Sequence, residues 1–153
     1  RGKSGMPKTL SPIQRAYLAG FLDGDGSIYV RLKPNTDYRF GFQVAPAVIL
    51  FQSSKDRRIF ERICSMIGLG YLRERNDGIL EYTINKQDAI RTFLEMVRPY
   101  VVMKVRQTKL MLRILEKKSK VRSKKDFKEL MDLIDRFRDL NYSKRRKKHI
   151  LTP

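Results

Sequence analysis

Ten residues constrain the fold of this chain more than any others: residues 18–27 read LAGFLDGDGS. The stretch places two aspartates and three glycines at the end of an apolar segment. A carboxylate is costly to bury alone, and each glycine weakens a helix. The combination therefore needs a specific structural reason at the place where the apolar segment ends.

The residues around this stretch predict a helix with an unusual face. Residues 11–14 read SPIQ, which offers a serine N-cap, a proline for the first turn and a glutamine to complete a capping box. Ala16, Gly20 and Gly24 recur every four residues and would form one stripe of small side chains. Such a stripe lets a second backbone approach closely. The alternative is a helix packed only on its own core, where the glycines bring a cost without a benefit.

The rest of the chain predicts two pairs of strands with helices between and after them. Residues 27–33 alternate strictly between apolar and polar side chains, which is typical of a half-buried strand. The other predicted elements are a turn at 34–37, a strand at 38–51 with a bulge or edge at Pro46, a helix at 53–68, strands at 71–75 and 79–84, and helices at 86–99, 105–118 and 126–141. This order indicates an α+β fold whose antiparallel sheet has helices on one face and is bare on the other.

Cationic, aromatic and amide side chains gather on the predicted bare face. Side chains of these types can reach both phosphates and base edges when strands lie in the major groove of DNA. The alternative is an ordinary solvated face, but its excess of cations favours binding. The expected DNA-binding residues are Tyr29, Arg31, Lys33, Tyr38, Gln43, Arg73, Arg75, Glu81 and Thr83.

Charge points to the same kind of partner. Lys and Arg number 34 against 16 Asp and Glu, a net charge of +18, and such a surface attracts polyanions. An anionic membrane is the alternative, but the basic residues are spread over strands, helices and tail rather than over one amphipathic helix. We expect no membrane contact and an intracellular protein that works together with DNA, with the compartment left open. Residues 1–10 are expected to be a flexible arm and residues 143–153 a basic tail.

Several other kinds of site lack the residues they need. The chain has one cysteine, Cys64, and one histidine, His149. An intrachain disulfide is therefore impossible, and a His/Cys zinc site lacks ligands. A Ser–His–Asp triad would have to use a histidine of the basic tail. Cys64 lies in a helical apolar pattern and is expected to be a core side chain.

The stretch LAGFLDGDGS, on a capped helix and followed directly by a basic alternating strand, resembles the signature of the LAGLIDADG homing endonucleases. The element order αββαββα is similar to that of the family. The resemblance therefore implies a curved, antiparallel sheet with helices on one face and DNA on the other. The resemblance covers residues 11–142, the expected endonuclease domain. The chain carries one copy of the motif, which implies a homodimer in which two motif helices pack through Ala16, Gly20 and Gly24.

The resemblance also implies a metal site. Asp25 matches the acid that ligates a divalent cation, helped by the backbone carbonyl of Gly24. Mg²⁺ is the expected ion, with Mn²⁺ or Ca²⁺ as other divalent cations, and no small-molecule cofactor is expected. Asp23 is expected to cap or orient the motif.

Three further family positions can be carried over. Gln52 matches a glutamine that orients the water or the metal's ligands, and Lys104 matches a basic residue near the scissile phosphate. A third position, normally basic, falls on Asp56, and Arg57 or Lys55 could serve in its place. Arg57 is taken as the catalytic candidate, and the choice between these two cations stays open.

The implied activity is double-strand cleavage of a long, pseudo-palindromic DNA site by metal-dependent hydrolysis. A non-cleaving relative, such as an intron RNA maturase or a transcription regulator, would have no need for Asp25, Gln52 and Lys104 together. A basic structural protein would have no need for the stripe of small residues. The joint presence of these features favours the endonuclease.

Overall fold

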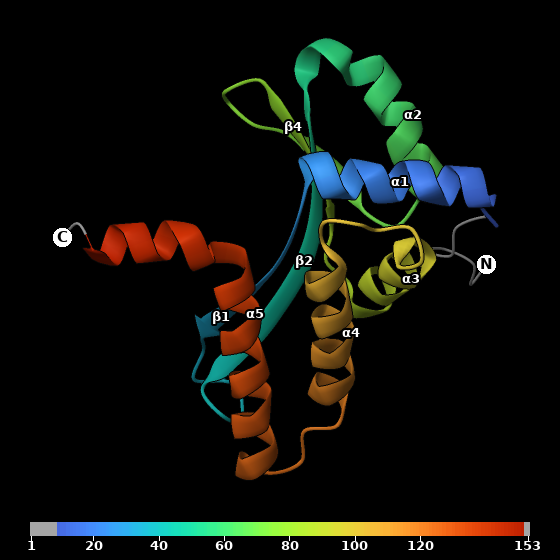
Figure 1. Cartoon of the computed structure of the whole chain (residues 1–153). Coiled ribbons are helices and arrows are strands. Elements are labelled where there is room, and N and C mark those ends of the chain that lie inside the picture. The colour runs from blue at the N-terminus through green and yellow to red at the C-terminus, as the bar shows by residue number, and fades with distance from the viewer. Residues whose placement is uncertain (1–8, 152–153) are drawn as a thin grey trace. The chain divides into compact units, whose positions relative to one another are not determined.

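The chain passes from its first helix directly into its first strand (Figure 1). The structure is a computed structural model that describes the backbone of residues 9–151 and the side chains of residues 9–141. The expected arm, residues 1–10, lies almost wholly outside the described residues. The elements are α1 (Pro12–Asp25), β1 (Gly26–Pro34), β2 (Phe42–Ser53), η1 (Ser54–Asp56), α2 (Arg57–Ile67), β3 (Tyr71–Glu74), β4 (Ile79–Ile84), α3 (Gln87–Val97), α4 (Val105–Ser119) and α5 (Lys124–Leu151).

The four strands form one sheet in the order β1-β2-β4-β3. Strand β4 runs antiparallel to both of its neighbours, with Leu50 opposite Tyr82 on one side and Leu72 opposite Tyr82 on the other. The order of elements through α3 is αββαββα, so the expected α+β class is confirmed. None of the helices in the described part of the chain is long and apolar enough to cross a membrane.

The first of two compact units comprises residues up to Ile28 and Pro46–Val105. The hydroxyl of Tyr82 lies in this unit and accepts hydrogen bonds from the backbone N–H groups of Leu69 (2.8 Å) and Gly70 (2.6 Å). This contact ties the segment that follows α2 to the inner strand β4. The fully buried side chains of the unit include Leu18, Leu22, Leu50, Phe60, Ile67, Leu80, Ile84, Ile90, Phe93 and Leu94.

The second unit comprises Tyr29–Ala45 and the chain from Arg106 onward. Its core is formed by the apolar faces of α4 and α5, with Met111, Ile114, Leu115, Leu130, Ile134 and Phe137 buried. The ring of Phe40, in the β1–β2 loop, stacks on Phe127 of α5 at a centroid distance of 4.9 Å. The helix predicted at 126–141 thus buries one apolar face in this core.

Strand β2 starts four residues later than predicted, so the placement of Tyr38 in a strand is wrong. The Asn35 side chain accepts a hydrogen bond from Asp37 N at 2.9 Å, an Asx turn that competes with strand pairing. Gly41, at φ +83°, closes the loop by donating to the Tyr38 carbonyl at 2.9 Å. Strand β2 then continues through Pro46, which precedes the stretch Val48–Ser53 paired with β4.

The helix predicted at 53–68 consists of two parts. A short 3-10 turn, Ser54–Asp56, precedes α2, which ends at Gly68 in the left-handed conformation. Helices α3 and α4 lie within two residues of the predicted bounds. Helix α5 starts at Lys124 and its backbone continues to Leu151, through most of the segment expected as a basic tail.

Candidate active site

Helix α1 is fixed in place by its cap and by one buried face. The Ser11 hydroxyl accepts from Gln14 N at 3.1 Å and the Gln14 amide oxygen accepts from Ser11 N at 2.9 Å, so the predicted capping box is confirmed. Leu18, Ala19 and Leu22 are buried and set the rotation of the helix about its axis. This rotation leaves the opposite face of α1 exposed.

The exposed face of α1 carries the stripe of small residues. Ala16, Gly20 and Gly24 are all exposed. A Cβ atom built on Gly20 or Gly24 would meet nothing within 4 Å in the described chain, so the fold of one chain does not require glycine there. Tyr17 (53% exposed) and Ile13 (82% exposed) flank the stripe. Ile13 was not among the expected interface residues, although its spacing of three from Ala16 places it on the same helical face.

Asp25 is the last residue of α1, and its side chain is exposed. In the described part of the chain its carboxylate has no hydrogen-bond or ion-pair partner. Unpaired carbonyl groups at a helix C-terminus carry partial negative charge, so Asp25 adds to a locally negative site in a basic protein. Gly26 allows the abrupt change to strand, because a Cβ there would lie 2.8 Å from the Leu22 carbonyl oxygen.

Asp23 binds the segment that precedes α4. Its carboxylate accepts from the backbone N–H groups of Val102 (2.8 Å), Met103 (3.1 Å) and Lys104 (3.0 Å). In return, the Lys104 ammonium donates to the Asp23 backbone carbonyl at 2.9 Å. Asp23 therefore holds the segment before α4, and four hydrogen bonds bring Lys104 to the end of the motif helix.

The donor set at the end of α1 fits a hard divalent cation, but one chain provides only part of it. A group of three or more His, Cys, Asp or Glu side chains that could hold a metal ion does not occur among the described residues. The oxygen donors at this end of the helix are the Asp25 carboxylate and backbone carbonyls such as that of Gly24. Mg²⁺ prefers such oxygens and keeps several waters, so one or two carboxylates suffice for it.

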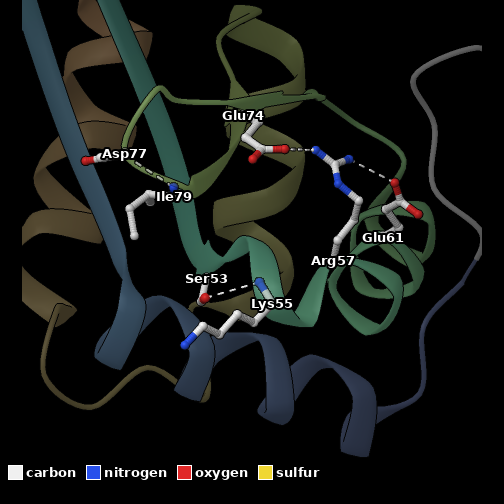
Figure 2. A network of polar contacts seen from close by, with 7 residues as sticks. All are labelled: Ser53, Lys55, Arg57, Glu61, Glu74, Asp77 and Ile79. Atoms are coloured by element: carbon white, nitrogen blue, oxygen red, sulfur yellow. Dashed lines mark hydrogen bonds and ion pairs between the residues drawn. The ribbon is translucent and has the colours of Figure 1, made fainter.

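Of the two cations considered for the third basic position, Lys55 and Arg57, the structure pairs Arg57 with carboxylates. The Arg57 guanidinium pairs with Glu61 (3.1 Å) and with Glu74 (2.6 Å), and Figure 2 shows it stretched between the two carboxylates. These carboxylates raise the pKa of Arg57, Glu74 contributing most. The Lys55 side chain extends away from Arg57 in the same view and has no ion pair within residues 9–141.

Gln52 is the second-to-last residue of β2. It lies opposite Leu80 of β4, is half-buried, and its amide oxygen accepts from Ser53 N at 2.8 Å. The next backbone N–H, that of Ser54, donates to Gly78 in the β3–β4 turn at 2.9 Å. The end of β2, which carries Gln52, is therefore fixed to the neighbouring hairpin.

Glu81 organises the two arginines of the β3–β4 hairpin. It lies directly opposite Arg73 and pairs with it at 2.8 Å, and it also approaches Arg75 at 3.6 Å. Glu81 raises the pKa of Arg73 through this hydrogen bond. The expected exposure of Thr83 is wrong: it is 8% exposed, because it lies in the inner strand β4 between Ile49 of β2 and Tyr71 of β3.

The remaining expected DNA contacts belong to the second unit. Arg31 and Lys33 of β1 are exposed, and the Arg31 guanidinium lies 5.3 Å from the centre of the half-buried Tyr29 ring, within cation–π range. Gln43 is half-buried near the start of β2. Tyr38 is exposed in the β1–β2 loop rather than on a strand. Alternation along β1 therefore yields the cationic face that the sequence predicts.

Cys64 is a buried side chain of α2, as expected. Desolvation by its surroundings raises the pKa of its thiol to about 12, with Glu61 acting in the same direction. A thiol with this pKa is protonated at neutral pH, and a protonated thiol is a poor nucleophile. Cys64 therefore contributes packing and not chemistry.

The sequence profile of a family described as LAGLIDADG endonuclease matches residues 18–112. The chain is 34% identical over 132 residues to DNA endonuclease I-CreI of Chlamydomonas reinhardtii, covering 86% of this chain and 80% of that protein. It is also 37% identical over 102 residues to DNA endonuclease I-CvuI of Chlorella vulgaris, covering 67% of this chain and 63% of that protein.

Solved structures agree with these sequence relationships. A crystal structure of I-CvuI with its DNA target in the presence of Ca superposes with a TM-score of 0.76 at 33% identity, over 82% of this chain and 80% of that one. A second I-CvuI structure, in the presence of Mg with DNA not cleaved, gives the same values. The archaeal intron-encoded endonuclease I-Vdi141I shares the fold, with a TM-score of 0.74 at 21% identity over 83% of each chain.

Proposed function

The chain belongs to the LAGLIDADG endonuclease family, as residues 18–27 imply, and we propose that two copies of it cut both strands of a long, pseudo-palindromic DNA site. The exposed Asp25 carboxylate at the end of an exposed stripe of small residues supports this function most directly. A twofold dimer presents the same surface twice, which suits a DNA site whose halves mirror each other. Such an enzyme works inside the cell, in the compartment that holds its DNA target.

Pairing of the α1 stripes creates the catalytic centre. Glycine at positions 20 and 24 permits close approach of a second α1, and close approach at Gly24 brings the two Asp25 side chains together. Two neighbouring carboxylates do not both stay ionised unless a cation lies between them. A divalent cation, Mg²⁺ in our proposal, would lower the pKa of a bound water and stabilise the charge that develops on the phosphate.

Side chains of each chain then complete the site. Gln52 orients the attacking water through its amide group. Lys104, anchored on the Asp23 carbonyl, provides positive charge beside the scissile phosphate. For the third basic position we propose Lys55, because Arg57 is bound by two carboxylates.

The sheet residues bind the DNA. Arg31 and Lys33 of β1 and Arg73 and Arg75 of the hairpin contact phosphates and base edges, with Tyr29, Tyr38 and Gln43 adding apolar and amide contacts. Glu81 forms ion pairs with both hairpin arginines. These ion pairs restrict the motion of the two guanidinium groups and so fix the direction in which they point. Guanidinium groups held in a fixed direction suit bidentate recognition of guanine.

The test is cleavage of a randomised duplex library with and without Mg²⁺, followed by sequencing of the cut ends. We expect metal-dependent cuts at one long site with approximate twofold symmetry. The matched control is Asp25→Asn, which keeps the size and shape of the side chain while removing its charge. We expect the variant to bind the recovered site with unchanged affinity and to leave it uncut.

Two outcomes would contradict the proposal. Cleavage by Asp25→Asn at the wild-type rate would remove Asp25 from the metal site. Binding of one duplex sequence by the wild-type chain without cleavage, in any divalent metal, would assign it instead to non-cleaving nucleic-acid-binding proteins.

A further inference from the structure

Helices α4 and α5 enclose a groove lined mainly by cations. Its lining comprises Arg106, Lys109, Leu110, Arg113, Arg136, Asp139 and Leu140, around a space of about 550 Å³. The four cationic side chains are exposed, whereas Leu110 is buried and Leu140 half-buried. The groove thus has an apolar floor with positive walls and one carboxylate, Asp139.

The four cations of this groove are not neutralised by the protein. Within residues 9–141 none of them makes an ion pair or a hydrogen bond to a side chain, in contrast to Lys117 on the same helix, which pairs with Glu129 at 2.6 Å. Exposed lysines and arginines grouped without carboxylate partners repel one another. An arrangement of this kind is stabilised by an anion from outside the chain.

The groove lies on the side of α5 opposite to the one that meets Tyr29 and Arg31 of β1, two of the residues proposed to contact the cleaved DNA. Arg138 and Asn141 of α5 line a hollow with Tyr29 and Arg31 of β1, whereas Arg136, Asp139 and Leu140 line the groove with α4. At about 100° per residue, these two sets lie on opposite sides of α5. A duplex bound on β1 therefore leaves the groove open.

The spacing of the cations along α4 matches a nucleic-acid strand. Arg106, Lys109 and Arg113 share one helical face and span about 10.5 Å at ~1.5 Å per residue. Along the axis of a duplex, one strand carries a phosphate about every 3.4 Å, or roughly three over that length. We propose that this groove binds the phosphate backbone of a second nucleic-acid segment, separate from the duplex that the sheet binds.

The test compares two triple variants that remove the same charge. Arg106→Gln, Lys109→Gln and Arg113→Gln empty one wall of the groove, while Lys124→Gln, Lys125→Gln and Lys128→Gln remove three exposed lysines at the start of α5. Both sets keep good helix formers. Fluorescence anisotropy then measures binding of labelled oligouridylate RNA and oligothymidylate DNA over a range of salt concentrations.

We expect the groove variant to lose affinity for the oligomers and to lower the slope of log K against log salt by about 2, given ~0.7 per phosphate contact on a single strand. The control variant should lose less than half as much. Tighter binding of the RNA would identify RNA as the source of the phosphates, and equal binding would identify any single strand. Thermal unfolding monitors the fold, and Arg136→Gln on α5 provides a second, independent variant.

Equal losses for the two triple variants would overturn the proposal, because they would reflect only the overall charge. Unchanged oligomer binding by the groove variant would also overturn it. The Asp25→Asn protein serves as a further reference. If it binds the oligomers as the wild-type chain does, the groove acts independently of cleavage, whatever becomes of the proposed endonuclease activity.

Discussion

At the scale of single residues, Asp23 and Lys104 behave as one unit. Three backbone N–H groups and one carboxylate hold the Lys104 segment against the motif helix. We expect Asp23→Ala to reduce the single-turnover cleavage rate roughly tenfold, equivalent to about 1.4 kcal/mol, while duplex affinity stays near the wild-type value. The rate falls because loss of the Asp23 carboxylate releases residues 102–104 and so displaces the Lys104 ammonium.

The control for this prediction is Asp23→Asn, which keeps one acceptor oxygen and should recover part of the rate. Cleavage is measured well below the unfolding temperature of each variant, so that lost stability does not imitate lost positioning. A wild-type cleavage rate for Asp23→Ala would show that Lys104 does not depend on Asp23.

The pair Lys55 and Arg57 permits a second test at this scale. We expect Lys55→Ala to slow cleavage, because its ammonium makes no ion pair with the side chains of residues 9–141, and to leave folding unchanged. Arg57→Ala breaks two exposed ion pairs and should change the free energy of unfolding little, with near-normal cleavage. Cleavage assays beside urea unfolding separate the two effects, and the reverse pattern would return the catalytic role to Arg57.

At the scale of elements, α1 is a complete helix whose exposed small-residue face we propose to pack against another α1. We expect Gly20→Leu to halve the mass seen by sedimentation equilibrium, because the added side chain prevents two backbones from meeting. The isolated helix gains about 1 kcal/mol of propensity from this change, so a folded monomer is the expected product.

The control variant is Ser65→Leu, which adds a similar side chain on the exposed face of α2 and should remain a dimer. A dimeric Gly20→Leu would contradict the helix seam.

Elements with strong local signals were predictable from the sequence, and contacts between distant segments were not. The capping box of α1 and the turn of the β3–β4 hairpin depend on residues two or three apart. Asp23 meets residues about 80 positions away, and Arg57 meets Glu74 17 positions away, so neither partner has a local signature. Thr83 alternates like an exposed residue, but neighbours on two other strands cover it. The late start of β2 follows from side-chain chemistry in the Asn35 turn that outweighs the apolar pattern.

At the scale of the whole molecule, a net charge of +18 influences folding and binding in opposite directions. Self-repulsion destabilises the compact chain, and salt screens it over a Debye length of about 8 Å at physiological ionic strength. We therefore expect added NaCl to raise the free energy of unfolding in urea while it weakens DNA binding. Paired urea and DNA titrations at several salt concentrations test this, and a fold that weakens with salt would show that ion pairs outweigh the repulsion.

The exposed glycine face of α1 also limits how this protein can evolve. Because one gene encodes both halves of the assembled enzyme, every substitution on the sheet is made twice, once for each arm of the target. Recognition can then change only in mirrored pairs, and a target that diverges in one arm alone becomes harder to follow. Duplication and fusion of the gene would lift that restriction, since each copy could then adapt to its own arm while the two glycine faces still met.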